Sequence, residues 1–471
     1  MLSLVLPLLT LLQPVPDGLE QPLQRGELKG ARVAVCVVDV ETGQRLFSRS
    51  ADAPMAPASN MKLVTTAASL SLLGAEHVFT TRVCASAAPD ADGVLHGDLV
   101  IVGGGDPCLR EDLFSDPQGR EPAEVLASFV TAAGIRRVEG RLLLDDGLFD
   151  RQWLCPDWKG GDIGSDYAAP VGALSLFGNC LTLQVNGAGA TASLVTAAEG
   201  FRVRDELQPA KSSKVYDLGA LRPDADGVVR VQGRIGSEVG AQLVRVPVID
   251  PTAYFGSCVL AQLRRAGVEV AQGQAVEAGA GERAPHALGA LTSPLVNAVL
   301  VANKESDNGL ADHLFKNLGA RKGGEGSFAG GQRAVLDWLE HGVGTAVDGV
   351  VLRDGSGLSS NDRITARLLT DVLLSMARRN DAAGTAFLRS LPVAGLDGSL
   401  RDRMQDPPLQ GAVRAKTGYI NGVSCLSGFA RTQSGRTLAF SLLINEFDER
   451  FGNKSMKSIE DDFCRALVTQ S

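Results

Sequence analysis

Residues 57–73 read PASNMKLVTTAASLSLL, and the placement of the polar side chains within this stretch decides how the whole chain is interpreted. A helix is predicted over 59–73, and it is expected to be buried because apolar side chains cover most of its circumference. The polar residues follow i, i+3, i+4 spacing and form one stripe: Ser59, Lys62, Thr66 and Ser69. Burial lowers the pKa of a lysine, so a neutral amine one turn after Ser59 can take the proton of the serine hydroxyl. The stretch therefore predicts a nucleophilic serine.

The S-x-x-K pattern also has a plain structural interpretation. A serine before a helix caps it, and a lysine can extend its ammonium group to solvent. The pattern occurs once in this chain, because no other lysine has a serine three residues before it. Further motifs are needed to choose between the two readings.

Two further motifs favour the catalytic reading. Ser306-Asp307-Asn308 precedes a helix predicted over 309–318, and Lys416-Thr417-Gly418 lies in a strand predicted over 413–419. Taken singly, the first is a helix cap and the second a polar strand edge. In the order S-x-x-K, S-x-N, K-T-G, the three form the motif set of serine β-lactamases and penicillin-binding proteins.

With these motifs in place, the sequence resembles the D-alanyl-D-alanine carboxypeptidases/endopeptidases of the low-molecular-mass class C penicillin-binding proteins, peptidase family S13. The similar blocks are 57–63, 97–99 with 103–107, 167–175, 354–359 and 395–400. The resemblance runs from about Val33 to the C-terminus. It implies an α/β fold, with a serine β-lactamase/penicillin-binding transpeptidase-like catalytic domain in which an antiparallel sheet is covered by helices.

The resemblance also implies the domain organisation. The long gap between Ser59 and Ser306 is expected to hold a large β-rich insertion over 83–286, with two nested domains. The catalytic domain is then discontinuous and comprises 24–82 and 287–471. Strands predicted in the insertion are 98–102, 141–145, 181–185, 228–232 and 242–248, and helices are 123–133 and 254–266. Elsewhere we expect a hairpin at 32–49, helices at 295–303, 309–318, 331–340, 366–376 and 455–468, and strands at 413–419, 423–430 and 437–444.

The catalytic roles follow from the resemblance together with the chemistry of these side chains. Ser59 is expected to attack the carbonyl between two D-alanines and form an acyl-enzyme, while Lys62 takes its proton. Ser306 is expected to relay a proton to the leaving amine. Asn308 is expected to hold the substrate amide and Lys62.

Substrate binding is assigned to the K-T-G strand. Lys416 and Thr417 are expected to bind the terminal carboxylate, and Gly418 to let the substrate backbone come close. The strand itself is expected to pair with the peptide by β-addition. The backbone N–H groups of Ser59 and Tyr419 are expected to form the oxyanion hole.

The resemblance implies a pocket for the diamino acid side chain of the stem peptide. Asp162 is the expected partner of its ammonium group and Tyr167 a wall. Where the family often has an arginine for the side-chain carboxylate, this chain has Ser360. Weak recognition of that carboxylate is therefore expected, unless Arg363 or Arg353 reaches the pocket instead.

Composition narrows the classes of partner. The chain has 471 residues and a formal net charge of −8, with no basic block, so the charge pattern of a nucleic-acid binder is missing. Five histidines leave little room for a histidine-built site, and we expect no metal and no cofactor. The eight cysteines contain no C-x-x-C, and we assign no disulfide. Expected partners are peptidoglycan peptides and β-lactam inhibitors, and peripheral association with a membrane stays open.

The N-terminus suggests export. Residues 1–12 are nearly all apolar, too few to span a bilayer but suited to the core of a signal segment within 1–23. No Lys or Arg precedes this run, and no small-x-small cleavage site precedes Pro16. Since stem pentapeptides lie outside the cytoplasm, the expected location is periplasmic or otherwise extracytoplasmic.

Two other functions stay open at this stage. A β-lactamase uses the same motif set but needs fast deacylation, and the long insertion argues against it. A non-catalytic peptidoglycan-binding relative is expected to have lost Ser59, Lys62 or the K-T-G, and none is lost.

Overall fold

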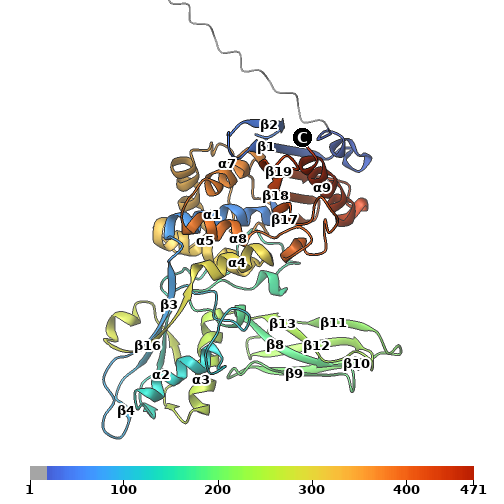
Figure 1. Ribbon diagram of the computed structural model, residues 1–471. Coiled ribbons are helices and arrows are strands. Elements are labelled where there is room, and N and C mark those ends of the chain that lie inside the picture. The colour runs from blue at the N-terminus through green and yellow to red at the C-terminus, as the bar shows by residue number, and fades with distance from the viewer. Residues whose placement is uncertain (1–17, 471) are drawn as a thin grey trace, which may run out of the picture.

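The computed structural model describes residues 18–470 and shows two bodies joined by a pair of long strands (Figure 1). We call residues 18–77 and 295–470 the main body and residues 78–294 the insertion. The joining strands are β3 (Val78–Ala85) and β16 (His286–Pro294), which pair antiparallel. The boundaries predicted at 82/83 and 286/287 fall inside these two strands. We infer that this strand pair is the connection between the catalytic domain and its insertion.

The main body is built on a five-stranded antiparallel sheet. Its order is β17 (Val413–Ile420), β18 (Val423–Arg431), β19 (Thr437–Asn445), β1 (Arg32–Asp39) and β2 (Arg45–Arg49). Asn421-Gly422 connects the first two strands, and Gly422 has a φ of +74°, which glycine adopts without steric cost. The sequence prediction of this hairpin is confirmed.

Helices cover both faces of the sheet because its strands alternate between two cores. In β1, Cys36 faces the core around α1, whereas Val35 and Val37 face the core around α9. The helices of the main body are α1 (Met61–Leu73), α4 (Leu295–Lys304), α5 (Asn308–Lys322), α6 (Phe328–Asp337), α7 (Ala366–Ala377), α8 (Ala382–Ser390) and α9 (Gly452–Val468). As predicted, α1 is buried over most of its length.

The insertion carries its own sheet and an arm. The sheet has the order β15 (Gln274–Val276), β7 (Leu142–Asp145), β5 (Leu99–Val102), β3 and β16, and it packs with α2 (Pro122–Ala132) and α3 (Pro251–Arg265). A small parallel sheet joins β4 (Val94–Leu95), β6 (Arg137–Val138) and β14 (Glu269–Val270). The arm comprises residues 180–247 and projects to the side in Figure 1.

The arm consists of two three-stranded sheets. One has the order β13 (Gln242–Pro247), β8 (Cys180–Asn186) and β9 (Thr191–Leu194). The other has the order β10 (Arg202–Pro209), β12 (Val228–Ile235) and β11 (Tyr216–Ala220). In sequence the arm lies between β7 and α3, so it interrupts the rest of the insertion.

A loop of the insertion also packs against the main body. Trp158 donates a hydrogen bond from Nε1 to Asp354 Oδ2 at 2.8 Å and meets Phe328 edge-on. On the same loop, Asp150 forms an ion pair of 2.6 Å with the buried Lys316. These contacts hold residues 150–170 beside the K-T-G strand and the S-x-x-K helix.

Most predicted elements are found within a few residues of their expected bounds. The sequence analysis missed β3, β16, the short strands β4, β6, β14 and β15, the arm strands β9, β10 and β11, and α8. All eight cysteines are buried free thiols. Of the segment 1–23 expected to direct export, residues 1–17 lie outside the described part of the chain. No helix within residues 18–470 is long and apolar enough to cross a membrane.

Candidate active site

The nucleophile candidate lies in a tight turn. Ser59 is in the 3₁₀ turn Ala58–Asn60, directly before α1. Ala58 has a φ of +45°, in the left-handed region that costs a residue with a Cβ about 1–2 kcal/mol. The carbonyl of Ala58 packs against Gly357, where a Cβ would lie 1.8 Å from that oxygen. Glycine at 357 therefore allows the turn that presents Ser59.

Lys62 connects the first two motifs. Its side chain is fully buried, and its Nζ donates to Ser59 Oγ at 2.9 Å, to Asn308 Oδ1 at 2.7 Å and to the Ser356 carbonyl at 2.8 Å. Burial lowers the pKa of Lys62 to about 8, although the charges of Asp312 and Asp354 oppose the shift. The protonated amine satisfies all three acceptors. After losing a proton, it has a lone pair directed at the hydroxyl of Ser59.

Lys416 connects the second and third motifs. Its Nζ donates to Ser306 Oγ at 2.8 Å and to the Thr417 carbonyl at 2.9 Å. Burial, reinforced by the charge of Lys62, holds the pKa of Lys416 well below its ordinary value. Ser306 has a φ of +62°, and its hydroxyl faces Lys416 from the segment between α4 and α5. The three motifs thus meet at one point.

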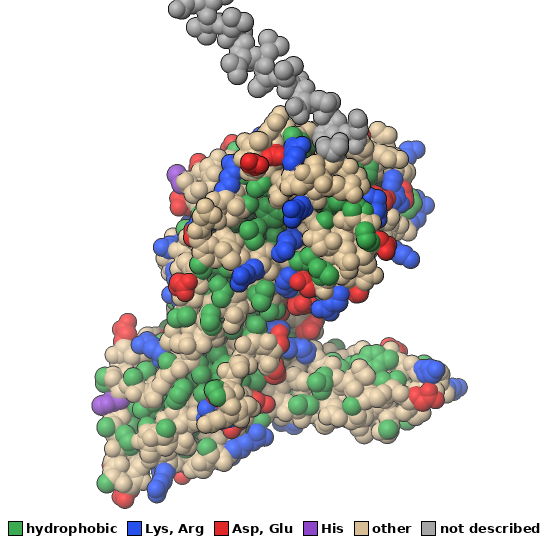
Figure 2. All heavy atoms as spheres, viewed as in Figure 1, with side chains coloured by type: hydrophobic (Ala, Val, Ile, Leu, Met, Phe, Trp, Pro, Cys, Tyr) green, Lys and Arg blue, Asp and Glu red, His purple; other side chains and the backbone are tan. Residues whose placement is uncertain are grey.

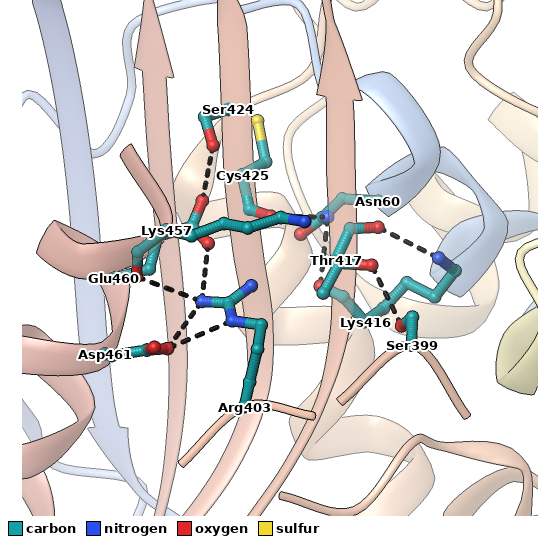
Figure 3. Close-up of polar contacts among 10 residues, drawn as sticks. All are labelled: Asn60, Ser399, Arg403, Lys416, Thr417, Ser424, Cys425, Lys457, Glu460 and Asp461. Atoms are coloured by element: carbon teal, nitrogen blue, oxygen red, sulfur yellow. Dashed lines mark hydrogen bonds and ion pairs between the residues drawn. The ribbon is translucent and has the colours of Figure 1, made fainter. Parts of the chain in front are cut away.

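Asn60, which the sequence analysis did not single out, ties the nucleophile turn to the sheet. Its Nδ2 donates to the carbonyls of Lys416 at 3.1 Å and Cys425 at 3.4 Å (Figure 3). A Cβ on Gly418 would lie 2.9 Å from the Pro57 carbonyl and 3.1 Å from the Ser59 nitrogen. Glycine at 418 therefore makes room for the turn at residues 57–59, which packs against this face of β17.

The hydroxyl groups beside Lys416 extend a polar surface toward solvent. Thr417 Oγ1 donates to Ser399 Oγ at 2.9 Å (Figure 3). Ser399 lies in the block 395–400, and the sequence alone does not show that it contacts the K-T-G. Lys416, Thr417 and Ser399 thus bring one amine and two hydroxyls together.

The outer edge of β17 is free only along its C-terminal half. β17 is the edge strand of the sheet, and residues 392–394 cover its first half through Ala415 N to Pro392 O at 3.0 Å and Ala394 N to Val413 O at 2.9 Å. The uncovered half runs from Lys416 to Ile420 and begins at the K-T-G. An extended peptide can add there as a further strand.

A cavity of about 350 Å³ opens beside Ser59. Its lining includes Asn308 and Tyr419, together with Asp162, Tyr167, Ser360 and Lys159. Tyr167 donates from its hydroxyl to Asp162 Oδ1 at 3.0 Å, and Asn308 Nδ2 donates to the Tyr167 carbonyl at 3.0 Å. Asp162 and Tyr167 are thus placed at the rim by the insertion.

Neither arginine named as a substitute for the family's arginine lines this cavity. Arg363 donates to the carbonyls of Ser360 at 2.8 Å and Asp362 at 2.7 Å. Arg353 pairs with Asp157 at 3.1 Å. The cation on the cavity wall is Lys159, which has an exposed side chain and which sequence reasoning missed.

The buried carboxylate of Asp354 holds the loop that contacts Lys62. Asp354 accepts hydrogen bonds from the backbone of Ser356 at 3.1 Å, Gly357 at 2.6 Å and Ser359 at 2.8 Å. This fixes the loop whose Ser356 carbonyl binds Lys62. Within residues 18–470, no group of three or more His, Cys, Asp and Glu side chains is placed to hold a metal ion.

The profile of the D-Ala-D-Ala carboxypeptidase 3 (S13) family matches residues 16–465. The chain belongs to this S13 family. The predicted resemblance is confirmed, and the protein is a peptidase of the D-Ala-D-Ala carboxypeptidase class.

Several relatives are similar to this S13 peptidase over most of their length, and one has a matching crystal structure. It is 35% identical over 452 residues to a D-alanyl-D-alanine carboxypeptidase of Actinomadura sp. (strain R39), covering 91% of this chain and 80% of the relative. It is 26% identical to the D-alanyl-D-alanine carboxypeptidase DacB of Haemophilus influenzae, covering 89% and 86%. The crystal structure of penicillin binding protein 4 (dacB) from H. influenzae superposes with a TM-score of 0.79 at 24% identity, over 97% of this chain and 98% of that one. The penicillin-binding fold class predicted from the sequence is confirmed.

Proposed function

We propose that this S13 peptidase removes the terminal D-alanine from peptidoglycan stem peptides through an acyl-enzyme on Ser59. The observation that carries the proposal is the position of Lys62 Nζ, 2.9 Å from Ser59 Oγ and 2.7 Å from Asn308 Oδ1. A buried amine with a pKa of about 8 is partly neutral near pH 7 and can act as a general base. Family membership supports the same reaction.

The acylation step uses the three motifs in turn. Ser59 Oγ attacks the carbonyl carbon between the two D-alanines as its proton passes to Lys62. Backbone N–H groups of Ser59 and Tyr419 are the proposed donors to the oxyanion. The C–N bond breaks as Ser306 gives its proton to the leaving nitrogen. The proton that Lys62 received then restores the hydroxyl of Ser306 through the polar network.

Deacylation uses Lys62 again, with a water molecule as the nucleophile. A water molecule attacks the ester carbon while neutral Lys62 takes one of its protons. The C–O bond to Ser59 breaks, and the serine oxygen recovers its proton from Lys62. The products are the shortened peptide and the regenerated enzyme.

Recognition of the terminal carboxylate is assigned to Lys416, Thr417 and Ser399. A carboxylate placed beside Lys416 favours the protonated form of this amine, which opposes the lowering of its pKa by burial. The resulting charge-assisted hydrogen bond is about twice as strong as a neutral one, and the two hydroxyls add further donors. The free edge of β17 then aligns the peptide backbone. The cavity beside Ser59 is proposed to take the side chain of the diamino acid, with Asp162 facing its ammonium group.

We propose that β-lactams acylate Ser59 as substrate analogues. The penicillin binding protein 4 of H. influenzae has been crystallised in complex with a β-lactam, and its fold matches with a TM-score of 0.77. Fluorescent penicillin should label the wild-type protein covalently, and the protein should release D-alanine from a pentapeptide. Ser59→Ala should do neither while keeping its melting temperature. Stoichiometric labelling of Ser59→Ala would reject the assignment of the nucleophile.

We propose that the chain acts outside the cytoplasm, because its proposed substrate is found there. Mass spectrometry of the protein extracted from its native cells should show a shortened N-terminus in the extracytoplasmic fraction. An intact Met1 on the bulk of the protein in a cytosolic fraction would contradict export.

A further inference from the structure

A second cavity is lined by Ser306, Asp307 and Asn308, and Ser59 is not part of its lining. It has a volume of about 250 Å³ and lies between the segment 305–313 of the main body and three parts of the insertion. Tyr167 and Asn308 line both cavities, so the two share a wall. Figure 2 shows acidic and basic side chains side by side at the notch between the main body and the arm.

The guanidinium groups of Arg245 and Arg110 both lie near Gly178, which has no side chain to fill the space between them. A Cβ on Gly178 would lie 2.6 Å from Arg245 Nη2 and 3.9 Å from Arg110 Nη1. Arg110 is neutralised by Asp307 at 2.7 Å and Asp112 at 2.6 Å. Arg245 donates to the Phe177 carbonyl at 2.7 Å and forms no ion pair with any described residue. Its charge is therefore available to an anion.

The rest of the lining provides partners for amide groups. Nδ1 of His313 lies 2.7 Å from the Gly309 carbonyl, which only accepts, so Nδ1 carries the hydrogen. Burial lowers the pKa of His313 to about 4, so its ring is neutral at neutral pH. Asp166 and Glu305 are exposed on the same cavity. The site thus combines one unpaired cation with acceptors for N–H groups.

The position of this cavity relative to the reaction indicates what it binds. Ser306 lines this cavity and also accepts the hydrogen bond from Lys416. Because Ser306 is the proposed proton donor to the leaving amine, that amine must lie close to Ser306. Anything attached to that amine extends from this point. Free D-alanine is a single residue and needs little room, whereas a cross-linked peptide leaves with a whole second strand that carries carboxylates.

We propose that the cavity between residues 305–313 and Arg245 binds the acidic peptide strand that carries the leaving amine of a cross-linked substrate, with Arg245 contacting a carboxylate of that strand. This inference rests on the proposed function, and it assigns a leaving-strand site for the endopeptidase action that the resemblance to the S13 family implies. The insertion then contributes to substrate binding, because Arg245 lies on its strand β13. Asp162 and Tyr167 serve the acyl side of the bond, and Arg245 serves the leaving side.

The test compares three substrates: a pentapeptide monomer, a cross-linked peptide dimer, and the same dimer with the carboxylates of its leaving strand amidated. The carboxylate beside the scissile amide, which is assigned to Lys416, stays free in all three. Arg245→Gln should lower kcat/KM for the anionic dimer about tenfold, the lower end expected for a lost charge-assisted hydrogen bond. The same variant should change kcat/KM for the monomer and for the amidated dimer by less than about twofold. Arg245→Lys should retain most activity on the anionic dimer. Arg234→Gln, an exposed arginine of β12 in the same arm, is the matched control and should change nothing.

The wild-type protein provides a test that depends on no variant. It should prefer the anionic dimer to the amidated dimer about tenfold, and equal kcat/KM values would overturn the inference. Equal effects of Arg245→Gln on all three substrates, or failure to cleave either dimer while D-alanine is still released, would also overturn it and leave the proposed function standing. Failure to release D-alanine or to bind penicillin would reject the proposed function itself, and this inference with it.

Discussion

Lys416 Nζ donates a hydrogen bond of 2.8 Å to Ser306 Oγ, which joins the K-T-G strand to the S-x-N segment. The two residues are therefore expected to act as one unit. For release of D-alanine, kcat/KM should fall in Ser306→Ala and in Lys416→Ala, and the double variant should lose less than the sum. The expected coupling is about 0.5–3 kcal/mol. Additive losses in the four-protein cycle would show that the contact is not used in the reaction.

The rate of acylation should follow the ionisation of Lys62. Because burial lowers its pKa to about 8, the amine is mostly protonated below this pH and cannot act as a base. Penicillin acylation should therefore increase with pH and level off above an apparent pKa of about 8. Lys62→Ala should be slower by about 10²–10⁴-fold and should lose this pH dependence. An unchanged profile in Lys62→Ala would assign the base to another group.

Gly418→Ala should reduce activity more than stability. The added Cβ would lie 2.9 Å from the Pro57 carbonyl, so the nucleophile turn must move away from β17. Overpacking of this kind costs about 1–3 kcal/mol, and the displacement falls on Ser59 itself. We expect a loss of at least tenfold in kcat/KM for the pentapeptide. Gly240→Ala, where a Cβ meets nothing within 4 Å, is the control and should leave activity unchanged.

Two buried aspartates should respond differently to the same substitution. Asp354→Asn replaces one acceptor oxygen by a donor among backbone N–H groups, and should cost at least about 2 kcal/mol of unfolding free energy.

Burial and the charge of Asp354 raise the pKa of Asp362 well above its ordinary value. The native state thus holds this proton more tightly than the unfolded chain, so wild-type stability falls as pH rises from about 4 through the folded-state pKa.

Asp362→Asn removes that dependence, since the amide cannot ionise. Its melting temperature should match the wild type at low pH and exceed it increasingly as pH rises. Thermal unfolding followed by circular dichroism between pH 4 and 8 measures both variants. A parallel pH dependence in Asp362→Asn and wild type would show that Asp362 is ionised in the native state.

Recognition of the diamino acid carboxylate should be weak. Ser360 provides only neutral hydrogen bonding, and the side chain of Lys159 is exposed, so its charge is screened. The ratio of kcat/KM between peptides with a free and an amidated side-chain carboxylate should stay below about 30-fold, or about 2 kcal/mol. Lys159→Ala should bring the ratio close to one. A larger wild-type ratio would show an intact carboxylate site.

The sequence by itself determined the chemistry wherever it is local. Ser59 and Lys62 are one helical turn apart, so their contact follows from the helix, and the turn at Asn421-Gly422 determines the hairpin that carries the K-T-G. The three motifs together with the further similar blocks were enough to predict the family, and local sequence patterns predicted most elements of the main body. In these cases the interacting groups are neighbours in the chain, and local backbone geometry alone brings them together.

Tertiary structure alone decided the contacts between distant segments. β3 and β16 pair with each other across the whole insertion, so no turn in the local sequence indicates that the two segments are partners. Lys159 and Arg245 could not be assigned for the same reason: nothing near either residue in the sequence shows which cavity it faces. Their roles depend on how the insertion packs against the main body, and this packing arises from the summed burial of many side chains, not from any single motif.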